Sequence, residues 1–391
     1  MVLSRRKKLL FTGILVAFAF AMVEAGVRIV FAMRVGPSVL FYGLRAPRQE
    51  TTVSVWDPDN NVGRYTKFRP HQVRFDNDSE TQVRFTVTIN SRGFRGKEFS
   101  DAKKPGVVRV ISLGESSTFG FYARDDQTYP YYMEELLNAQ CHGRVFEVLN
   151  FGIPHLRSNH ILALFLAEAV QLEPDVITYY QGSNENNLAN EALPPPQVRA
   201  DFGVSWLGGK IFALARSNLL SVAFVHSLVS SAKPEQFSEG EVRAHTEALR
   251  EPFIRNVSRI QQESQRRGIV FIAATQQMQS LLIRDREELR RTPFDVERGI
   301  VKQKLARDGS LTYRERSFYA QGVLMDDLRH WASTHRVPLL DLIRVLDPER
   351  DVLVNWVHLR PRGNELIAAA FSKEILTRVC AHPVGSPKKT G

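Results

Sequence analysis

The chain is poor in cysteine and has no long run of charge of one sign. Among its 391 residues the only cysteines are Cys141 and Cys380, which excludes a disulfide-dense scaffold and a zinc site built from cysteines. Lys and Arg number 52 against 42 Asp and Glu, a formal charge of +10, yet most of the basic residues are scattered among acidic ones. Without a basic stripe or a nucleic-acid-binding motif, this charge does not predict binding of nucleic acid.

A long apolar segment is present only at the N-terminus. Residues 9–23 carry no charge, Glu24 and Arg28 interrupt the segment, and apolar residues continue to Met33. Charges four residues apart can pair on a helix, which lowers the cost of placing them in a membrane. The segment exceeds the roughly 20 residues that span a bilayer core. Residues 1–33 are therefore predicted to form a basic tip and a transmembrane anchor.

The flanking charges predict the orientation of this anchor. Four basic residues at 5–8 precede the apolar segment, so the positive-inside rule places the N-terminus in the cytoplasm and the rest of the chain outside it, in the periplasm or the extracellular space. A cleaved signal peptide is the alternative, because residues 17–19 read Ala-Phe-Ala, a small-x-small pattern. We favour the uncleaved anchor, since apolar residues continue past that pattern.

The rest of the chain divides into a neck, a body and a tail. Residues 34–105 are rich in Arg, Asp, Asn, Thr and Val, and residues 82–90 alternate as a half-buried strand does. We therefore predict a β-containing neck over 34–105. The body extends over 106–382, and residues 383–391 are expected to be a disordered tail.

Short apolar runs alternate with helical patterns along the body. The predicted strands cover 107–113, 145–149, 175–180, 269–274 and 337–341. The predicted helices cover 129–139, 158–171, 241–267, 316–335 and 363–381. Buried strands that alternate with helices predict an α/β sandwich with a central parallel sheet.

An insertion at about 190–244 interrupts this alternation. It contains three consecutive prolines at 194–196 and an apolar stretch at 206–229. The apolar stretch is compatible with a lid or a membrane-touching helix. We favour a helix packed on the body, because Lys210, Arg216 and His226 interrupt it.

Polar residues follow the predicted strands, and sites in open α/β sheets form beyond the carboxyl ends of the strands. These segments read Gly-Glu-Ser-Ser-Thr-Phe-Gly at 114–120, Asn-Phe-Gly-Ile-Pro-His at 150–155, Gly-Ser-Asn-Glu at 182–185 and Asn-Trp-Val-His-Leu-Arg-Pro-Arg-Gly-Asn at 355–364. In this order the segments resemble the blocks of the SGNH/GDSL hydrolase family. The neck run Asn-Ser-Arg-Gly-Phe-Arg-Gly at 90–96 is similar to that of membrane-anchored members. The resemblance implies a flavodoxin-like three-layer sandwich, the SGNH hydrolase fold.

The resemblance also implies roles for individual residues. Ser116 would be the nucleophile, and His358 would act first as general base and then as general acid. The Ser116 amide, the Asn184 side chain and a backbone amide at His155 or Gly152 would bind the oxyanion. No metal or cofactor is expected.

Three features of these blocks leave alternatives open. Ser117 is a competing nucleophile, although the spacing to the end of its block favours Ser116. The family has Gly where this chain has His155, and Asn355 replaces the aspartate of the triad. The Asn355 carbonyl could hold His358, but it offers no charge. The chain could therefore use a Ser–His dyad, use Asp351 as a substitute acid, or have lost catalysis.

The expected function is that of an exported, membrane-anchored serine esterase that acts on acyl esters, including O-acetyl esters of an envelope glycan. The expected partners are an ester-bearing substrate and the membrane, through the N-terminal helix. An O-acyltransferase would need the same residues and would differ only in its acceptor. A glycan-binding or assembly protein without catalysis is the alternative that Asn355 and His155 motivate.

A disulfide between Cys141 and Cys380 is a further prediction. In a flavodoxin-like order the first and last helices lie on the same face of the sheet, and each cysteine follows the end of one of these helices. An exported chain with an even number of cysteines allows such a bridge. Two buried thiols in separate packing sites are the alternative.

Overall fold

The computed structural model describes residues 5–35, 52–56, 64–186 and 235–380. The apolar stretch at 206–229, most of the predicted insertion and the tail at 383–391 lie outside these residues. The chain divides into two compact units, of which Thr52–Glu191 together with Glu235–Gly391 forms the larger. The N-terminal helix belongs to the other unit and is described separately.

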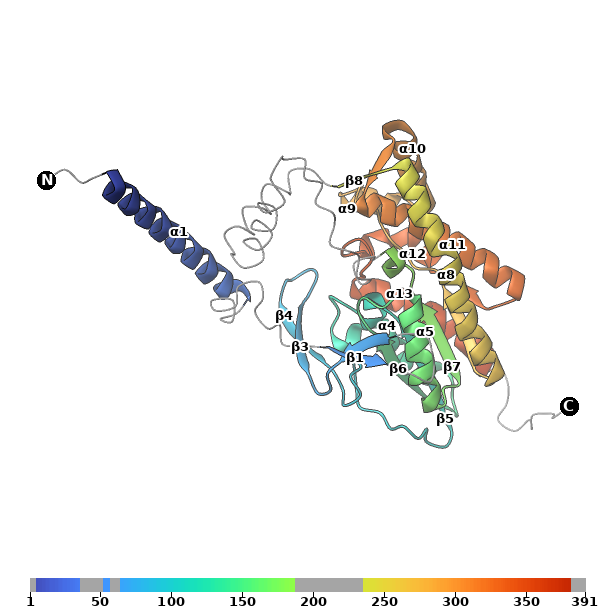
Figure 1. Ribbon diagram of the computed structural model, residues 1–391. Helices are drawn as coiled ribbons and strands as arrows, with labels where there is room; N and C mark the ends of the chain where they lie inside the picture. Colours follow the sequence, from blue (N-terminus) through green and yellow to red (C-terminus); the bar gives the residue numbers. More distant parts are fainter. Residues whose placement is uncertain (1–4, 36–51, 57–63, 187–234, 381–391) are drawn as a thin grey trace. The chain divides into compact units, whose positions relative to one another are not determined.

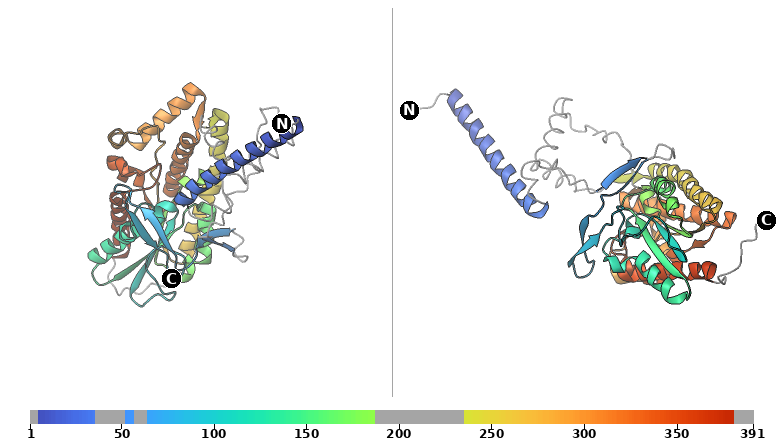
Figure 2. Two further views of the ribbon diagram at one scale, coloured as in Figure 1. Left: turned by 90° about the vertical axis from the view of Figure 1, so that its left-hand side faces the viewer. Right: turned by 90° about the horizontal axis from the view of Figure 1, so that it is seen from below.

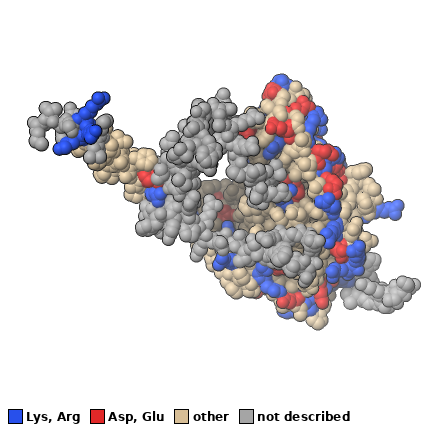
Figure 3. Space-filling view, in the orientation of Figure 1, with Lys and Arg blue, Asp and Glu red and all other residues tan. Residues whose placement is uncertain are grey.

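Helix α1 (Arg5–Val35) contains an apolar stretch that is long enough to cross a membrane. It is the only helix among the described residues that passes this test of length and composition. The side chain of Arg28 donates to Glu24 at 2.8 Å, so the two interrupting charges pair as expected. Lys and Arg gather at the N-terminal tip of α1, whereas basic and acidic residues are interspersed on the visible face of the body (Figure 3).

The larger unit is built on a five-stranded parallel sheet (Figure 1). Its strands are β5 (Val107–Gly114), β6 (Val145–Gly152), β7 (Val176–Tyr180), β9 (Val270–Ala274) and β11 (Leu339–Leu340). They lie in the order β6-β5-β7-β9-β11. Numbered along the chain this order is 2-1-3-4-5, which confirms the flavodoxin-like prediction.

Helices cover both faces of the sheet and complete the three-layer sandwich (Figure 2). One face is covered by α5 (Ser158–Ala167), α8 (Glu239–Arg266) and α11 (Tyr313–His335). The other is covered by α4 (Tyr129–Gln140) and α13 (Pro361–Val379). Adjacent strand residues point to opposite faces, so Ile111 and Val110 of β5 are buried in different clusters. This burial on both faces explains why the strands read as continuous apolar runs.

Shorter elements join the layers. They are α3 (Ser116–Phe119), α9 (Arg286–Arg291), α10 (Phe294–Asp308), α12 (Leu342–Leu346), the antiparallel pair β8 (Gln236–Ser238) and β10 (Ser310–Thr312), and the 3₁₀ helices η2 (Asp125–Gln127), η3 (Ala169–Leu172), η4 (Ser183–Asn186) and η6 (Asp347–Val352). The polar segments singled out from the sequence lie at the end of β5 and in α3, at the end of β6 and just after it, at η4, and across the start of α13.

Two antiparallel strand pairs precede the sheet. Strands β1 (Thr52–Trp56) and β2 (Arg64–Phe68) form one pair, and β3 (Val73–Asn77) and β4 (Arg84–Thr88) form the other. Strand β4 confirms the strand expected within 82–90. Strand β2 is tied to the body, because Tyr65 Oη donates to Glu168 Oε1 at 2.6 Å and Lys67 Nζ lies 2.8 Å from the same oxygen.

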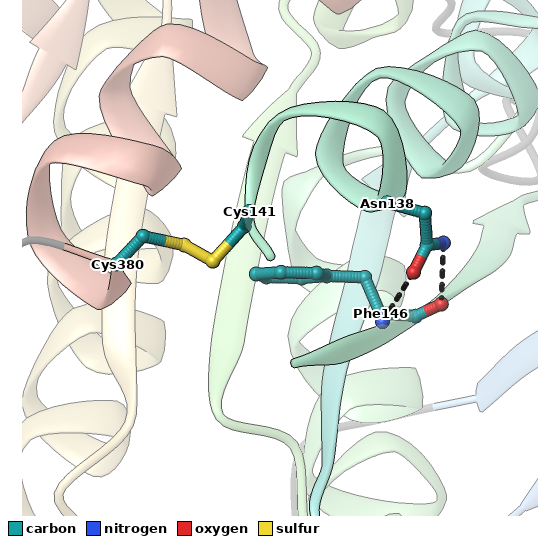
Figure 4. The surroundings of a disulfide bond; sticks show 4 residues. All are labelled: Asn138, Cys141, Phe146 and Cys380. Carbon is teal, nitrogen blue, oxygen red and sulfur yellow. Dashed lines mark hydrogen bonds between the residues drawn. A yellow bond between two sulfur atoms is a disulfide. The ribbon is translucent and has the colours of Figure 1, made fainter. Parts of the chain in front are cut away.

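A disulfide joins Cys141 and Cys380, with their Cα atoms 6.1 Å apart (Figure 4). Cys141 follows the last residue of α4, and Cys380 follows the last residue of α13. The two helices pack against one face of the sheet and end close together. The predicted bridge is therefore confirmed, and the alternative of two separate thiols is wrong.

Candidate active site

Helix α3 presents Ser116 directly after the first strand of the sheet. Strand β5 ends at Gly114, and α3 begins two residues later. A Cβ atom on Gly114 would lie 1.9 Å from Thr118 Oγ1, and one on Gly152 would lie 2.2 Å from the Phe119 nitrogen. Both glycines are therefore needed for α3 to pack against β5 and β6.

A buried arginine from the neck fixes the other end of α3. The guanidinium of Arg95 donates to the carbonyl oxygens of Phe119 at 3.0 Å, Gly120 at 2.6 Å and Ala123 at 2.6 Å. It also donates to Asp125 Oδ1 at 2.8 Å. Carbonyls at the end of a helix need such donors. The neck motif at 90–96 therefore supports the helix that carries Ser116.

The structure brings Ser116 and His358 into hydrogen-bond contact. Ser116 Oγ lies 2.7 Å from His358 Nε2, and both side chains are buried. This meets the spacing expected between a nucleophile and its base. The Ser117 hydroxyl lies instead near the Val357 carbonyl oxygen, at 3.5 Å, and near Gln276 Nε2, at 3.2 Å. The geometry therefore favours Ser116 over Ser117.

Asn355 contacts His358 through its amide nitrogen, so the expectation that its carbonyl holds the ring is wrong. Asn355 Oδ1 accepts from the backbone N–H groups of Val357 at 3.1 Å and His358 at 3.0 Å. Asn355 Nδ2 lies 2.9 Å from His358 Nδ1. This orientation of the amide is assigned from its bonds, because rotation would turn the NH₂ group toward two N–H donors. The neutral ring therefore accepts at Nδ1 and carries its proton on Nε2.

Asp351 does not supply a carboxylate to His358. Its backbone oxygen accepts from Arg360 Nε at 3.2 Å, and no bond between Asp351 and His358 occurs among the described residues. The position beside His358 Nδ1 is occupied by Asn355. Among the described residues, no carboxylate therefore bonds to this ring nitrogen.

Of the residues expected to bind an oxyanion, Asn184 and Gly152 donate to oxygen atoms of the protein, and His155 has a left-handed backbone conformation. Asn184 lies in η4, directly after β7, and its Nδ2 donates to the Leu156 carbonyl at 3.2 Å. The Gly152 amide donates to Asn150 Oδ1 at 2.9 Å, which corrects the expectation that it is a donor for the oxyanion. His155 has a φ of 69°, a left-handed conformation that glycine adopts most readily.

Glu115 and Gln276 belong to the site, although their roles were not found from the sequence. The side chain of Glu115 is fully buried. Its Oε2 accepts from Ser116 Oγ and lies 3.5 Å from Asn184 Nδ2, and its Oε1 accepts from Gln276 Nε2 at 2.5 Å. The available signals were a glutamate where the family has aspartate and a glutamine just beyond the end of β9.

Burial lowers the pKa of His358, and the charges around the ring act in both directions. Glu115 and Asp76 raise this pKa, whereas His155 and Arg314 lower it further. Burial is the largest of these effects, because it disfavours the charged imidazolium. The ring is therefore held in its neutral form to a lower pH than an exposed histidine.

Aromatic rings surround His358. The ring centroid of His358 lies 5.2 Å from that of Phe121, 5.6 Å from that of Tyr122 and 6.4 Å from that of Trp356. The neck also contributes to this rim, because Asp76 Oδ2 accepts from the Tyr122 amide at 2.8 Å. The three rings are only half-buried, so they can offer flat apolar surface beside the reacting atoms.

Within the described residues, no group of three or more His, Cys, Asp or Glu side chains could hold a metal ion. The polar groups gathered here are a hydroxyl, an imidazole, a carboxylate and three amides. Such a set can activate a serine and bind an oxyanion, which is the chemistry of acyl transfer.

Neither a family model nor a curated protein matches the chain. Solved structures are similar to it at low identity. A lipase/acylhydrolase from Enterococcus faecalis is 14% identical, with a TM-score of 0.40 over 69% of this chain and 96% of that one. A lipolytic protein of the G-D-S-L family from Veillonella parvula is 12% identical, with a TM-score of 0.39 over 70% and 100%. A mutant acetylxylan esterase from Geobacillus stearothermophilus is 13% identical, with a TM-score of 0.39 over 68% and 94%. These three similar structures are thus a lipase/acylhydrolase, a lipolytic protein of the G-D-S-L family and an acetylxylan esterase.

Proposed function

We propose that this protein is a serine ester hydrolase that forms an acyl-enzyme on Ser116. One observation carries the proposal: Ser116 Oγ lies 2.7 Å from His358 Nε2 at the carboxyl end of a parallel sheet, where α/β proteins place their sites. The Ser116 amide at the start of α3, the Asn184 side chain and the His155 amide are the groups that would bind the oxyanion.

A fluorophosphonate probe tests this proposal, because it reacts covalently with activated serines. The full-length protein should be labelled, Ser116→Ala should not be labelled, and the matched control Ser117→Ala should retain labelling. Mass spectrometry of the peptide should place the adduct on Ser116. A folded protein that resists the probe, or that is labelled at Ser117, contradicts the proposal.

The rim of the site supports a proposal for the substrate class. Phe121, Tyr122 and Trp356 favour an ester of a ring-shaped alcohol such as a sugar, whose apolar face can pack on aromatic rings. A small acyl group such as acetyl suits a nucleophile as buried as Ser116. Acetate release from O-acetylated polysaccharide should exceed release from long-chain lipid esters, and the reverse preference contradicts this assignment.

The proposed location is outside the cytoplasm, with α1 as the membrane anchor. The basic tip of α1 supports a cytoplasmic N-terminus, and the bond between Cys141 and Cys380 suits an oxidising compartment. An alkaline phosphatase fusion after residue 100 should be active and should remain in the membrane fraction. An inactive but stable fusion contradicts the orientation, and a soluble, shortened product indicates a cleaved signal peptide.

Binding without turnover is a second candidate function. It is favoured by Glu115, whose carboxylate lies between the Ser116 hydroxyl and the Asn184 amide, where an oxyanion would bind. Glu115→Ala distinguishes the two functions. Removal of an obstructing carboxylate should create or raise esterase activity, whereas removal of a working group should abolish it.

A further inference from the structure

Glu115 is a fully buried carboxylate beside the nucleophile, and no ion pair among the described residues includes it. Its hydrogen-bond partners are the Ser116 hydroxyl, the Asn184 amide and the Gln276 amide. A buried carboxylate without a cation is costly, so its position beside the Ser116 hydroxyl suggests a function.

A series of hydrogen bonds connects Asn355 to Glu115, and each group in the series donates to the next. Asn355 Nδ2 donates to His358 Nδ1, because its carbonyl is occupied by two backbone amides. The ring proton therefore lies on Nε2 and is donated to Ser116 Oγ, 2.7 Å away. The hydroxyl proton of Ser116 is then directed at Glu115 Oε2. In this arrangement the serine faces a donor at His358 and an acceptor at Glu115.

We propose that Glu115, and not His358, accepts the proton of Ser116 in the reaction proposed above. This inference rests on the proposed ester hydrolysis and assigns its general base. It departs from the role that the sequence resemblance implied for His358. His358 becomes a hydrogen-bond donor that orients the Ser116 oxygen.

His358 is a poor base here because Asn355 opposes the imidazolium. A protonated ring would point an N–H group from Nδ1 at the NH₂ group of Asn355, so that two donors would meet at 2.9 Å. Rotation of the amide would relieve this clash only by losing its bonds to the amides of Val357 and His358. The burial that lowers the pKa of His358 opposes the charged ring further.

Glu115 alone can accept and return the proton that is transferred in each step of the reaction. In acylation the Ser116 proton moves to Glu115 Oε2 while Oγ bonds to the carbonyl carbon of the ester. The bond from that carbon to the alcohol oxygen then breaks, and the alcohol takes the proton from Glu115. In deacylation a water molecule gives a proton to Glu115 as its oxygen attacks the acyl carbon, and Ser116 Oγ leaves with that proton.

The same proton transfer prepares the oxyanion site. Asn184 Nδ2 donates to the Leu156 carbonyl at 3.2 Å and lies 3.5 Å from Glu115 Oε2, so Glu115 is one of the groups that attract this amide. When Glu115 becomes neutral, that attraction weakens and Asn184 can turn its donor to the oxyanion. Proton uptake by Glu115 and oxyanion binding by Asn184 therefore occur together.

A double-mutant experiment on the full-length protein tests the assignment with 4-nitrophenyl acetate. Glu115→Gln should lower kcat/KM by about 100-fold or more, the usual contribution of a general base. In an Asn355→Asp background the new carboxylate accepts a hydrogen bond from an Nδ1–H group, so the neutral ring carries its proton on Nδ1 and Nε2 is free to act as the base. There Glu115→Gln should lower the rate by less than about tenfold, since the base has moved to His358. Equal losses in both backgrounds overturn the proposal.

Glu185→Gln is the matched control, because Glu185 is also a buried glutamate beyond a strand of the sheet but has no contact with Ser116. Its effect should be the same in both backgrounds. Thermal unfolding of every variant identifies losses that are due to misfolding.

Nitrogen NMR of the protein with ¹⁵N-labelled histidines gives a second readout that needs no turnover. The His358 signal, identified by its loss in His358→Gln, should show a neutral ring with its proton on Nε2. A proton on Nδ1 overturns the assignment of Glu115. Failure of Ser116 to react with a fluorophosphonate in any variant contradicts the ester hydrolysis itself, so the two failures are distinguishable.

Discussion

The guanidinium of Arg95 donates to the Gly120 carbonyl at 2.6 Å, so a side chain from the neck closes the helix that begins with Ser116. Arg95 is buried and also pairs with Asp125 at 2.8 Å. The neck is thus part of the candidate site, in addition to being the segment that precedes the body.

Replacement of Arg95 tests this coupling. Arg95→Ala should lower the free energy of unfolding by about 3–5 kcal/mol, because it leaves buried carbonyls and Asp125 without their partner. It should also lower the reaction of Ser116 with a fluorophosphonate. Urea unfolding measures the first effect and labelling kinetics the second.

Arg92→Ala is the control for Arg95→Ala. Arg92 lies in the same motif, but its pair with Asp101 is largely exposed, so its loss should cost less than about 1 kcal/mol. If Arg95→Ala and Arg92→Ala have equal effects, Arg95 does not support α3 as described.

Reduction of the disulfide should destabilise the larger unit. Cys141 and Cys380 are separated by 239 residues, and the loop-entropy estimate for a closed loop of this size is about 5 kcal/mol. Cys141→Ala/Cys380→Ala should therefore have a lower Tm than the oxidised protein, and reductant should lower the Tm of the wild type only. Detection of two free thiols in the unreduced, denatured protein would exclude the bridge.

Gly152→Ala should disturb the site through packing. The new Cβ would lie 2.2 Å from the Phe119 nitrogen, so α3 would have to move away from β6. We expect a loss of stability of at least about 1 kcal/mol and slower labelling of Ser116. Gly299→Ala in α10 is the control, because its Cβ meets open space and alanine favours a helix interior by about 1 kcal/mol. Equal effects of the two substitutions would contradict the packing argument.

The stability of the protein should fall as the pH is lowered from about 6.5, the ordinary pKa of histidine, toward 4. Burial, together with the positive charges of Arg316 and Arg157, lowers the pKa of His245 to about 4. Burial also lowers the pKa of His358. The unfolded chain therefore binds more protons than the folded one in this range, and stability rises with pH across it.

Urea unfolding at pH 7 and pH 5 measures this dependence. His245→Asn should reduce the difference between the two pH values, whereas substitution of the exposed His330 by Asn should leave it unchanged. An undiminished pH dependence in His245→Asn would show that this histidine is not responsible.

The sequence was sufficient to predict the sheet, because short apolar runs alternate with helical patterns along the body. All five predicted strands and the principal helices are present, and the strand order is the one that the family resemblance implied. Helix α10 was missed, since its stretch Phe294–Asp308 mixes charges with few apolar residues. Its packing depends partly on an ion pair between Glu297 and Arg350 that is fully buried, and such a long-range contact has no local pattern.

The sequence predicted which residues form the candidate site better than it predicted the hydrogen bonds between them. The site brings together Ser116 and Asn184, each of which follows the carboxyl end of a strand, and His358, which precedes the last helix. The orientation of the Asn355 amide depends on two backbone amides that only the folded loop places. The contact of Glu115 with Ser116 likewise depends on side-chain direction, which sequence spacing does not specify.

The bonds of Arg95 also determine where the body could be cut without loss of its site. A protease that cleaved between Gly96 and Val107 would leave Arg95 on one fragment and Gly120 on the other. A cut ahead of Arg64 would keep β2, β3, β4 and the motif at 90–96 with the body. In the membrane-anchored enzyme proposed above, release of an active body would therefore require the earlier cut, whereas a later cut would release a body in which α3 had lost the bonds of Arg95.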